Sequence, residues 1–164
     1  MIVREVLLED AEKYLQMLKI LDEQTNFLMF EPGERKTTLE DQKNIIKYNV
    51  ENKIPMFLME IEGEIVGFLK GVRYKCNRMN QNLHIALGIL SSYRGKGGGK
   101  ALMNKVDQWS QNNNIKRMEL TVACENKKAV NLYKSMGFEI EGIKRSSFKL
   151  EDKFLDQYYM GKVY

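Results

Sequence analysis

The sequence predicts an α/β protein with a mixed, mostly antiparallel central sheet of about seven strands, flanked by about four helices. Three observations lead to this prediction. Apolar segments with strand and helix periodicity follow one another in the order β-α-α-β-β-β-α-β-α-β-β. The length of 164 residues suits a single core and no repeat or linker divides it, so we expect one domain over residues 1–164. A hydrophobic content of 43% and a charged content of 29% are ordinary for a globular chain.

The first elements are a short strand and an amphipathic helix. Ile2–Val6 has the pattern of a strand, and a helix is expected to start at Leu8-Glu9-Asp10. Its apolar positions share one face, and they are Ala11, Tyr14, Leu15 and Leu18. Because Pro32-Gly33 interrupts the helical pattern, we expect a loop at Gln24–Thr37.

A second helix and a β-hairpin follow this loop. Thr38 and Asp41 have the spacing of an N-terminal capping pair, and Pro55 ends the helix. The apolar positions of the helix are Ile45, Ile46 and Val50. Met56–Ile61 and Ile65–Tyr74 are expected to pair as a hairpin around a turn at Glu62-Gly63.

A strand, a glycine-rich turn and a helix occupy the middle of the chain. Leu83–Leu90 has the pattern of a strand, and Leu102, Val106 and Trp109 predict a helix that ends near Gln111. The segment between them, within Tyr93–Met103, concentrates glycines and cations.

The C-terminal part is expected to contribute a strand, a helix and a closing strand pair. These elements are a strand at Arg117–Val122, a helix at Asn126–Met136 closed by Gly137, and the pair Phe138–Ser147 and Phe154–Val163, joined near Glu151-Asp152.

The glycine-rich turn predicts an anion site. A turn that opens a helix just past a strand directs free backbone N–H groups and the positive end of the helix dipole at one point, which suits a phosphate. A Walker-type loop is disfavoured, because Arg94 stands where a glycine is needed and Ala101 where a metal-binding hydroxyl is needed. A dinucleotide fingerprint is disfavoured, because Lys100 stands where Gly or Ala is needed.

Two sequence blocks point to one known family. Arg94, Gly97 and Gly99 satisfy Arg-x-x-Gly-x-Gly, which resembles the acetyl-CoA pyrophosphate loop of the general N-acetyltransferase (GNAT) superfamily. Asn126–Gly142 resembles the family's Asn-x-x-Ala-x-x-Leu-Tyr-x-x-x-Gly-Phe signature, and Phe154–Met160 resembles the last strand of many bacterial members. The resemblance covers nearly the whole chain, and it implies a GNAT-like sheet whose central strands splay apart.

The resemblance implies acetyl-CoA as acyl donor and a set of residues that hold it. This set is Leu87, Gly88, Ile89, Arg94, Gly95, Lys96, Gly97, Gly98, Gly99, Lys100 and Asn126. The loop amides would hold the pyrophosphate, the strand end would pair with the pantetheine arm, and the Ile89 N–H would polarise the thioester carbonyl. Gly98 departs from the family's usual aliphatic residue, and a glycine lowers helix preference by about 1 kcal/mol, so we expect a looser loop.

Tyr133 is the expected catalytic residue. The resemblance implies that its hydroxyl protonates the coenzyme A thiolate. Helical spacing alone makes it a core aromatic that shares a face with Ala129 and Met136, and a buried ring still allows the hydroxyl to reach a cleft. Asn126 is expected to cap the following helix and, by resemblance, to contact the coenzyme arm.

The general base is left open by the sequence. Thr121 occupies the position where some relatives that acetylate protein N-termini carry a glutamate, and it cannot serve as a base. Glu119 lies on the same strand face, and His84 is the single histidine of the chain, with an intrinsic pKa suited to the task. The third alternative is a water chain that carries the proton to solvent.

The expected function is acetyl-CoA-dependent N-acetyl transfer to a primary amine of a small molecule or protein N-terminus, by direct attack. The alternative is a non-catalytic coenzyme A-binding regulatory module, and a donor other than acetyl-CoA stays open. The acceptor is expected against the first two helices and the loop between them, which carries Asn26, Phe27, Glu31, Glu34 and Arg35.

Composition limits the remaining partners. The net charge of +4 comes from well-mixed charges without a basic stripe, so no nucleic acid is expected. Charges interrupt every apolar run, so no membrane span is expected. Cys76, Cys124 and one histidine are too few ligands for a metal site. The charged N-terminus and the two thiols favour a cytoplasmic protein, and the chain is expected to be a monomer or homodimer.

Overall fold

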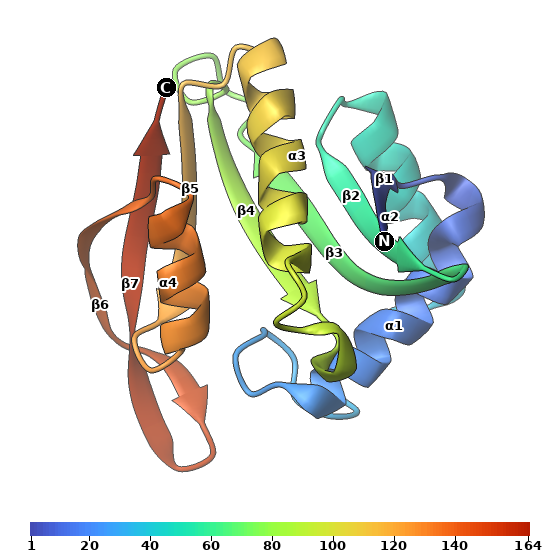
Figure 1. Ribbon diagram of the computed structural model, residues 1–164, viewed down its shortest axis with the longest axis horizontal. Coiled ribbons are helices and arrows are strands. Elements are labelled where there is room, and N and C mark those ends of the chain that lie inside the picture. The colour runs from blue at the N-terminus through green and yellow to red at the C-terminus, as the bar shows by residue number, and fades with distance from the viewer. The chain divides into compact units, whose positions relative to one another are not determined.

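The computed structural model describes residues 1–164, and its sheet has seven strands in the order β1-β2-β3-β4-β5-β7-β6 (Figure 1). The elements are β1 (Ile2–Glu5), η1 (Leu8–Asp10), α1 (Ala11–Gln24), α2 (Leu39–Glu51), β2 (Met56–Ile61), β3 (Glu64–Arg73), β4 (Asn82–Ile89), η2 (Ser91–Tyr93), α3 (Gly98–Asn112), β5 (Arg117–Ala123), α4 (Lys127–Ser135), β6 (Glu139–Leu150) and β7 (Lys153–Val163). The predicted α/β class, with a mixed sheet and four α-helices, is confirmed.

The pairing of the strands is mixed as expected. β1–β2, β2–β3, β5–β7 and β6–β7 pair antiparallel. β4 and β5 pair in parallel, from Asn82 opposite Arg117 to His84 opposite Glu119.

Most element boundaries lie within a residue of the expectation, and two larger differences have local reasons. Residues Leu8–Asp10 form a 3₁₀ turn before α1, in which the Asp10 carboxylate accepts a hydrogen bond from the Leu7 N–H over 2.7 Å. β6 continues past Ser147 to Leu150 because a register shift between Lys144 and Phe148 lets the strand resume its pairing with β7.

The chain divides into two compact units. The first comprises Met1–Val72 and Ala86–Trp109, and the second comprises Arg73–Ile85 and Ser110–Tyr164. Within the first unit, Figure 1 shows α1 and α2 on one face of β2 and β3, and α3 on the other. Buried residues on successive positions of β2 fit this arrangement, because alternate side chains of a strand point to opposite faces.

The core between α1, α2 and the sheet is apolar. Its residues are Val6, Ala11, Tyr14, Met17, Leu18, Leu21, Ile46, Met56, Leu58, Ile65 and Phe68. The Tyr14 and Phe68 rings lie 5.8 Å apart at a tilt, a favourable aromatic geometry. The predicted capping pair starts α2, since the Asp41 N–H donates to Thr38 Oγ1 over 3.1 Å and Asp41 Oδ2 accepts from the Thr38 N–H over 2.8 Å.

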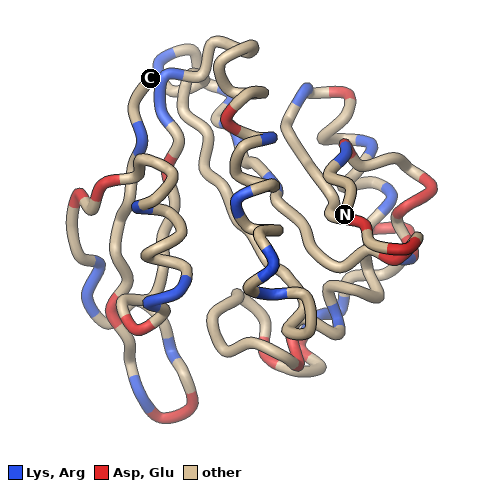
Figure 2. The backbone as a smooth tube through the Cα atoms, in the orientation of Figure 1, with Lys and Arg blue, Asp and Glu red and all other residues tan.

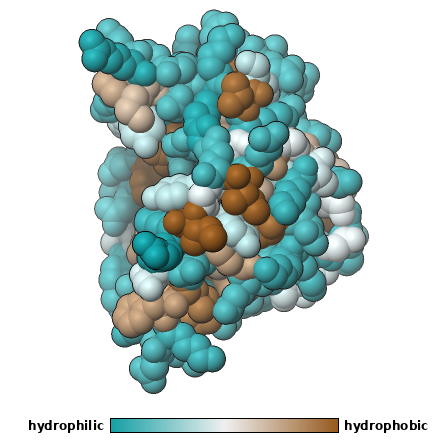
Figure 3. Space-filling model, turned by 90° about the vertical axis from the view of Figure 1, so that its left-hand side faces the viewer, coloured by the Kyte–Doolittle hydropathy of each residue, from teal (hydrophilic) through white to brown (hydrophobic).

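In the second unit, β5, β7 and β6 form the sheet and α4 packs on it (Figure 1). β6 is the edge strand, and Ile143 and Phe154 of the β6–β7 hairpin are exposed. Figure 3 views this side and shows hydrophobic side chains separated by hydrophilic ones. No helix in the structure is both long enough and apolar enough to cross a bilayer.

Candidate functional site

The loop that joins η2 to α3 has the backbone geometry of an anion site. Gly95 and Gly97 have φ of +75° and +83°, a left-handed conformation that glycine adopts without strain. The Ala101 N–H donates to Gly97 O over 3.0 Å and closes the first turn of the helix. The preceding amides, those of Gly98, Gly99 and Lys100, therefore have no acceptor within the helix and lie at the positive end of its dipole.

Three cations surround this helix start. The side chains of Arg94, Lys96 and Lys100 are exposed, and Figure 2 shows basic residues along the loop and the first turns of α3. Lys96 Nζ lies 5.5 Å from the centre of the Tyr93 ring, a cation–π distance. Free amides and exposed cations at one point fit a diphosphate.

Arg94 also has an intramolecular contact. Its Nε donates a hydrogen bond to Ile89 O over 2.7 Å. The side chain therefore ties the loop back to the last residue of β4. The structure brings Arg94 and the predicted residues at the end of β4 together.

Gly98 is buried against β2. A Cβ at Gly98 would lie 2.5 Å from Met59 Sδ and 3.4 Å from Ile89 Cδ1. The sequence interpretation treated this glycine as a residue that loosens the loop. In the structure, its lack of a side chain lets the start of α3 approach the sheet closely, so it serves packing.

The end of β4 is fixed on its other face too. A Cβ at Gly88 would lie 2.5 Å from Leu21 Cδ2 and 2.8 Å from Phe68 Cε1, so any larger residue would displace these side chains. The Leu90 N–H donates to Val66 O over 2.9 Å. Leu87 and Ile89 are half-buried at this strand end, and their pairing with a pantetheine arm stays a prediction.

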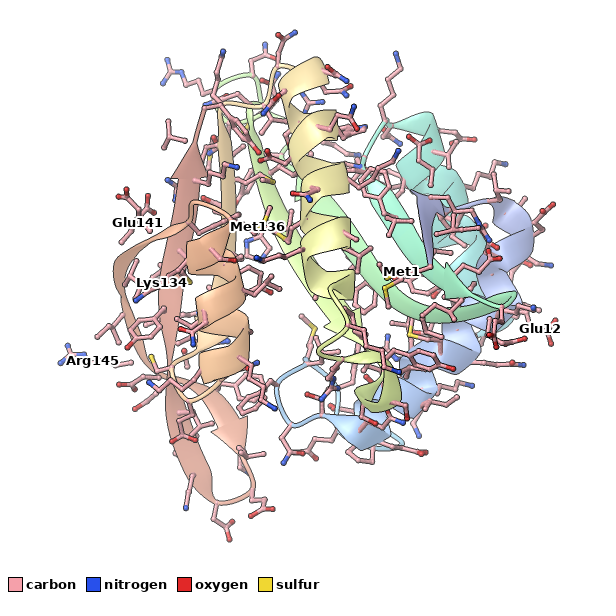
Figure 4. All side chains as sticks on the ribbon, in the orientation of Figure 1. Met1, Glu12, Lys134, Met136, Glu141 and Arg145 are labelled. Atoms are coloured by element: carbon pink, nitrogen blue, oxygen red, sulfur yellow. The ribbon has the colours of Figure 1, made fainter.

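Asn126 and Tyr133 lie at the two ends of α4, in the second unit. Asn126 Oδ1 accepts a hydrogen bond from the Ala129 N–H over 3.3 Å, so the predicted cap is confirmed. Lys134, in the last turn of the helix, is labelled in Figure 4. Gly137 follows with φ of +86°, as expected of a residue that closes a helix.

Tyr133 is 7% exposed, and the centres of its ring and the Phe138 ring lie 5.9 Å apart. Burial raises the pKa of Tyr133 to about 12. The phenol therefore keeps its proton at physiological pH and is a hydrogen-bond donor. The two interpretations of this tyrosine, a packed aromatic and a proton donor, are compatible in the structure.

The two candidate bases are neighbours. His84 on β4 lies opposite Glu119 on β5. Burial lowers the pKa of His84, the charge of Glu119 raises it, and the charge of Lys144 lowers it, with a net decrease. His84 is therefore a neutral imidazole at pH 7, with a lone pair available for a proton.

Glu119 is held by a network of charges. Glu119 Oε2 accepts from Arg117 Nε over 2.8 Å. The same guanidinium binds both carboxylate oxygens of Glu141, with a distance of 2.7 Å between Arg117 Nη1 and Glu141 Oε1. Glu141 belongs to β6 and is labelled in Figure 4. The guanidinium occupies Oε2 of Glu119, so this carboxylate is the weaker candidate for a base.

The side chains of the predicted acceptor loop form hydrogen bonds to α1 and within the loop. Arg35 donates to both carboxylate oxygens of Asp22 and its guanidinium lies 4.4 Å from the centre of the Phe30 ring. Glu34 Oε2 accepts from the Glu31 N–H over 2.8 Å. Arg35 and Glu34 therefore shape the loop, whereas the side chains of Asn26, Phe27 and Glu31 are exposed.

A shallow cavity of about 220 Å³ lies between the end of α1 and this loop, lined by Lys19, Asp22, Glu23, Gly33 and Arg35. Sequence reasoning missed Asp22. Its only signal was an acidic residue on the otherwise apolar side of α1, followed by an arginine in the loop.

A family model described as acetyltransferase (GNAT) family matches residues 15–138. Among curated proteins, L-amino acid N-acetyltransferase AaaT of Escherichia coli is 31% identical over 107 residues, which cover 63% of this chain and 64% of AaaT. The spermidine N(1)-acetyltransferase of Vibrio cholerae is 26% identical over 147 residues, or 87% of this chain and 83% of that protein. The chain thus spans less than two thirds of AaaT.

Solved structures share the fold. An acetyltransferase of the GNAT family from Streptococcus pneumoniae has a TM-score of 0.94 and 26% identity, and the match covers 99% of this chain and 98% of that one. The structure of yncA from Salmonella typhimurium with its cofactor acetyl-CoA has a TM-score of 0.89 and 14% identity, with 99% and 93% coverage.

Proposed function

The chain belongs to the acetyltransferase (GNAT) family, and on that premise we propose that it transfers the acetyl group of acetyl-CoA to a primary amine. The acceptor is a small molecule or a protein N-terminus, and residues 1–164 form one acetyltransferase domain. The observation that carries the proposal is the loop of Gly95–Lys100, whose free amides and cations match a diphosphate. The structure of yncA with its cofactor acetyl-CoA, a protein of the same fold, supports the choice of donor.

The proposed reaction has four requirements in this chain. The acceptor must lose a proton, the thioester must be held, its carbonyl must be polarised, and the leaving sulfur must receive a proton. We assign the holding of the coenzyme to the loop amides and to Leu87–Ile89, and the polarisation of the carbonyl to the Ile89 N–H. Asn126 is proposed to contact the coenzyme arm, and Tyr133 is proposed as the proton donor to sulfur.

His84 is proposed as the general base. The imidazole takes one proton from the acceptor ammonium, and the free amine forms the C–N bond as the C–S bond breaks. The thiolate takes the Tyr133 proton, and the second proton of the amine nitrogen restores the tyrosine. One proton per turnover leaves through His84 to solvent. His84 is preferred over Glu119 because the imidazole is neutral, whereas Arg117 already binds the carboxylate.

Proton donation from Tyr133 to the sulfur is favoured when the tyrosine receives a proton from the amine at the same time. A phenol with a pKa of about 12 does not protonate a thiolate outright, since an ordinary thiol has a pKa of about 8.5. The donation is therefore proposed to be concerted with the arrival of the second amine proton.

For the acceptor, we propose an amino acid or a polyamine. The names of the curated relatives support these classes, since one is an L-amino acid N-acetyltransferase and another a spermidine N(1)-acetyltransferase. The free cysteines Cys76 and Cys124 support a reducing, cytoplasmic setting for the reaction.

The test is release of coenzyme A thiol across a panel of amino acids, polyamines and N-terminal peptides. We expect turnover with at least one amine, and a loss of about 10²-fold or more in kcat for Tyr133→Phe, with little change in the affinity for acetyl-CoA. Binding of acetyl-CoA without turnover of any amine would favour the non-catalytic coenzyme A-binding module. Equal activity of Tyr133→Phe would remove the proposed donor while leaving the transfer reaction intact.

A further inference from the structure

The last residue of α1 reaches the start of the coenzyme loop. Gln24 Oε1 accepts a hydrogen bond from the Ser91 N–H over 2.8 Å, between residues 67 positions apart in the sequence. Ser91 begins η2, the short turn that leads from β4 into the loop of Gly95–Lys100. Nothing in the Arg-x-x-Gly-x-Gly pattern includes Gln24.

The same turn of α1 also holds the loop between α1 and α2, residues 25–38. Asp22 binds Arg35 through both carboxylate oxygens, at 2.6 and 2.8 Å. Gln24 immediately precedes this loop. One helical turn therefore contacts two loops. Asp22 binds Arg35, near the α2 end of residues 25–38, and Gln24 binds Ser91, which leads into the coenzyme loop.

Packing reinforces this connection. Leu21 and Leu28 are two of the side chains nearest to the place where a Cβ at Gly88 would lie, 2.5 and 3.3 Å from it. Leu28 belongs to the acceptor loop, and Gly88 to the strand end proposed to hold the thioester. Because Leu28 packs beside Gly88 and against the core, a displacement of Leu28 alters the packing at β4.

We propose that Gln24 is a positioning residue that couples the loop of residues 25–38 to the coenzyme loop. The inference rests on the proposed function, because it requires acetyl-CoA to bind Gly95–Lys100. By holding the Ser91 N–H, Gln24 fixes the direction in which the chain enters that loop. Ordering of the coenzyme loop by acetyl-CoA then orders the acceptor loop, and the two substrates bind with positive coupling.

Gln24 and Ser91 are both exposed, so water replaces their hydrogen bond when it is broken. The loss is therefore expected to alter the orientation of the loop more than the stability of the protein. A small effect on stability separates a positioning role from a merely structural one. The positioning role predicts that KM changes for both substrates while kcat at saturation stays nearly unchanged.

Three variants provide the test. Gln24→Leu removes the acceptor oxygen and keeps the approximate shape, whereas Gln24→Glu keeps an acceptor for the Ser91 N–H. Gln16→Leu, at an exposed position of the same helix, is the matched control. We expect Gln24→Leu to raise KM for acetyl-CoA and acceptor by about two- to tenfold, the range that one hydrogen bond supports, and Gln24→Glu to restore most of it.

Amide hydrogen exchange supplies a readout besides activity. In the wild type, acetyl-CoA should protect both residues 91–100 and residues 25–38, and in Gln24→Leu it should protect only the former. Unchanged exchange of residues 25–38 in the wild type, or wild-type coupling in Gln24→Leu, overturns the inference and leaves the function standing. If the wild-type protein does not bind acetyl-CoA, both the inference and the proposed function are overturned. That outcome is identified by the absence of protection at residues 91–100 when acetyl-CoA is added.

Discussion

Nε and Nη2 of Arg35 donate hydrogen bonds to the two carboxylate oxygens of Asp22, over 2.6 and 2.8 Å. The Asp22 side chain is 2% exposed and that of Arg35 is 13% exposed. This bidentate pair closes the loop of residues 25–38 onto α1, and both of its side chains are largely buried.

The first prediction concerns this ion pair. Arg35→Met leaves the Asp22 carboxylate buried without its partner and should lower the free energy of unfolding by about 3–5 kcal/mol. The double variant Asp22→Leu, Arg35→Met should cost clearly less than the sum of the two single changes, because neither charge is then left alone. Urea denaturation at pH 7 measures this cycle. Strictly additive effects would mean that the pair is not coupled.

The second prediction concerns the start of α3. Gly98→Ala places a Cβ 2.5 Å from Met59 Sδ, and overpacking of this kind costs about 1–3 kcal/mol. In the Met59→Ala background the same change should be neutral or stabilising by up to about 1 kcal/mol, because only the helix preference of alanine remains. Thermal or urea unfolding of the four proteins shows the change of sign. A similar cost in both backgrounds would contradict the close contact.

The third prediction concerns His84. It is the single histidine of the chain, so its imidazole signals in an NMR titration are unambiguous. Burial should place its pKa below 6.5. Lys144→Met should raise this pKa, because a positive charge is removed, and Glu119→Gln should lower it further. A midpoint above 6.5 would argue against a neutral base.

The same shift has consequences for pH dependence. Because the folded protein holds His84 with a lowered pKa, the unfolded chain binds the proton more readily. The contribution of His84 to stability is therefore fully present above pH 6.5 and is lost as the pH falls below it. The kcat for acetyl transfer should fall over the same acidic range, and His84→Gln should remove that limb along with most of the rate.

The fourth prediction concerns the cations at the coenzyme loop. Lys96→Met and Lys100→Met should each raise KM for acetyl-CoA and reduce its dependence on salt, because each removes an exposed charge beside the proposed diphosphate site. Lys149→Met, an exposed position on β6, is the matched control. A salt dependence equal to that of the wild type in both loop variants would place the phosphates elsewhere.

Local signals in the sequence predicted much of the fold. The capping pair Thr38–Asp41, the Asn126 cap and the glycine that closes α4 were all predicted, because each depends on residues a few positions apart. The glycine-rich turn that opens α3 was predicted for the same reason, since its glycines and its helix are contiguous.

Contacts between distant parts of the chain were not predicted. The interpretation of Gly98 as a loosening residue failed to anticipate Met59, and the Arg94 motif gave no indication of the hydrogen bond to Ile89 O. Likewise, the sequence left Glu119, His84 and a water chain open as the base, and it gave no indication that His84 pairs opposite Glu119 or that Arg117 binds Glu119. Such partners depend on tertiary pairing, which periodicity does not encode.

The free N–H groups at the start of α3 belong to the main chain. Every amino acid except proline supplies the same N–H. Substitutions of side chains at neighbouring positions would therefore leave this set of N–H donors in place, provided that Gly95 and Gly97 keep their left-handed conformation. Under the proposed function, substitutions in residues 25–38 would change the amine that is modified, while the same turn would continue to bind the donor.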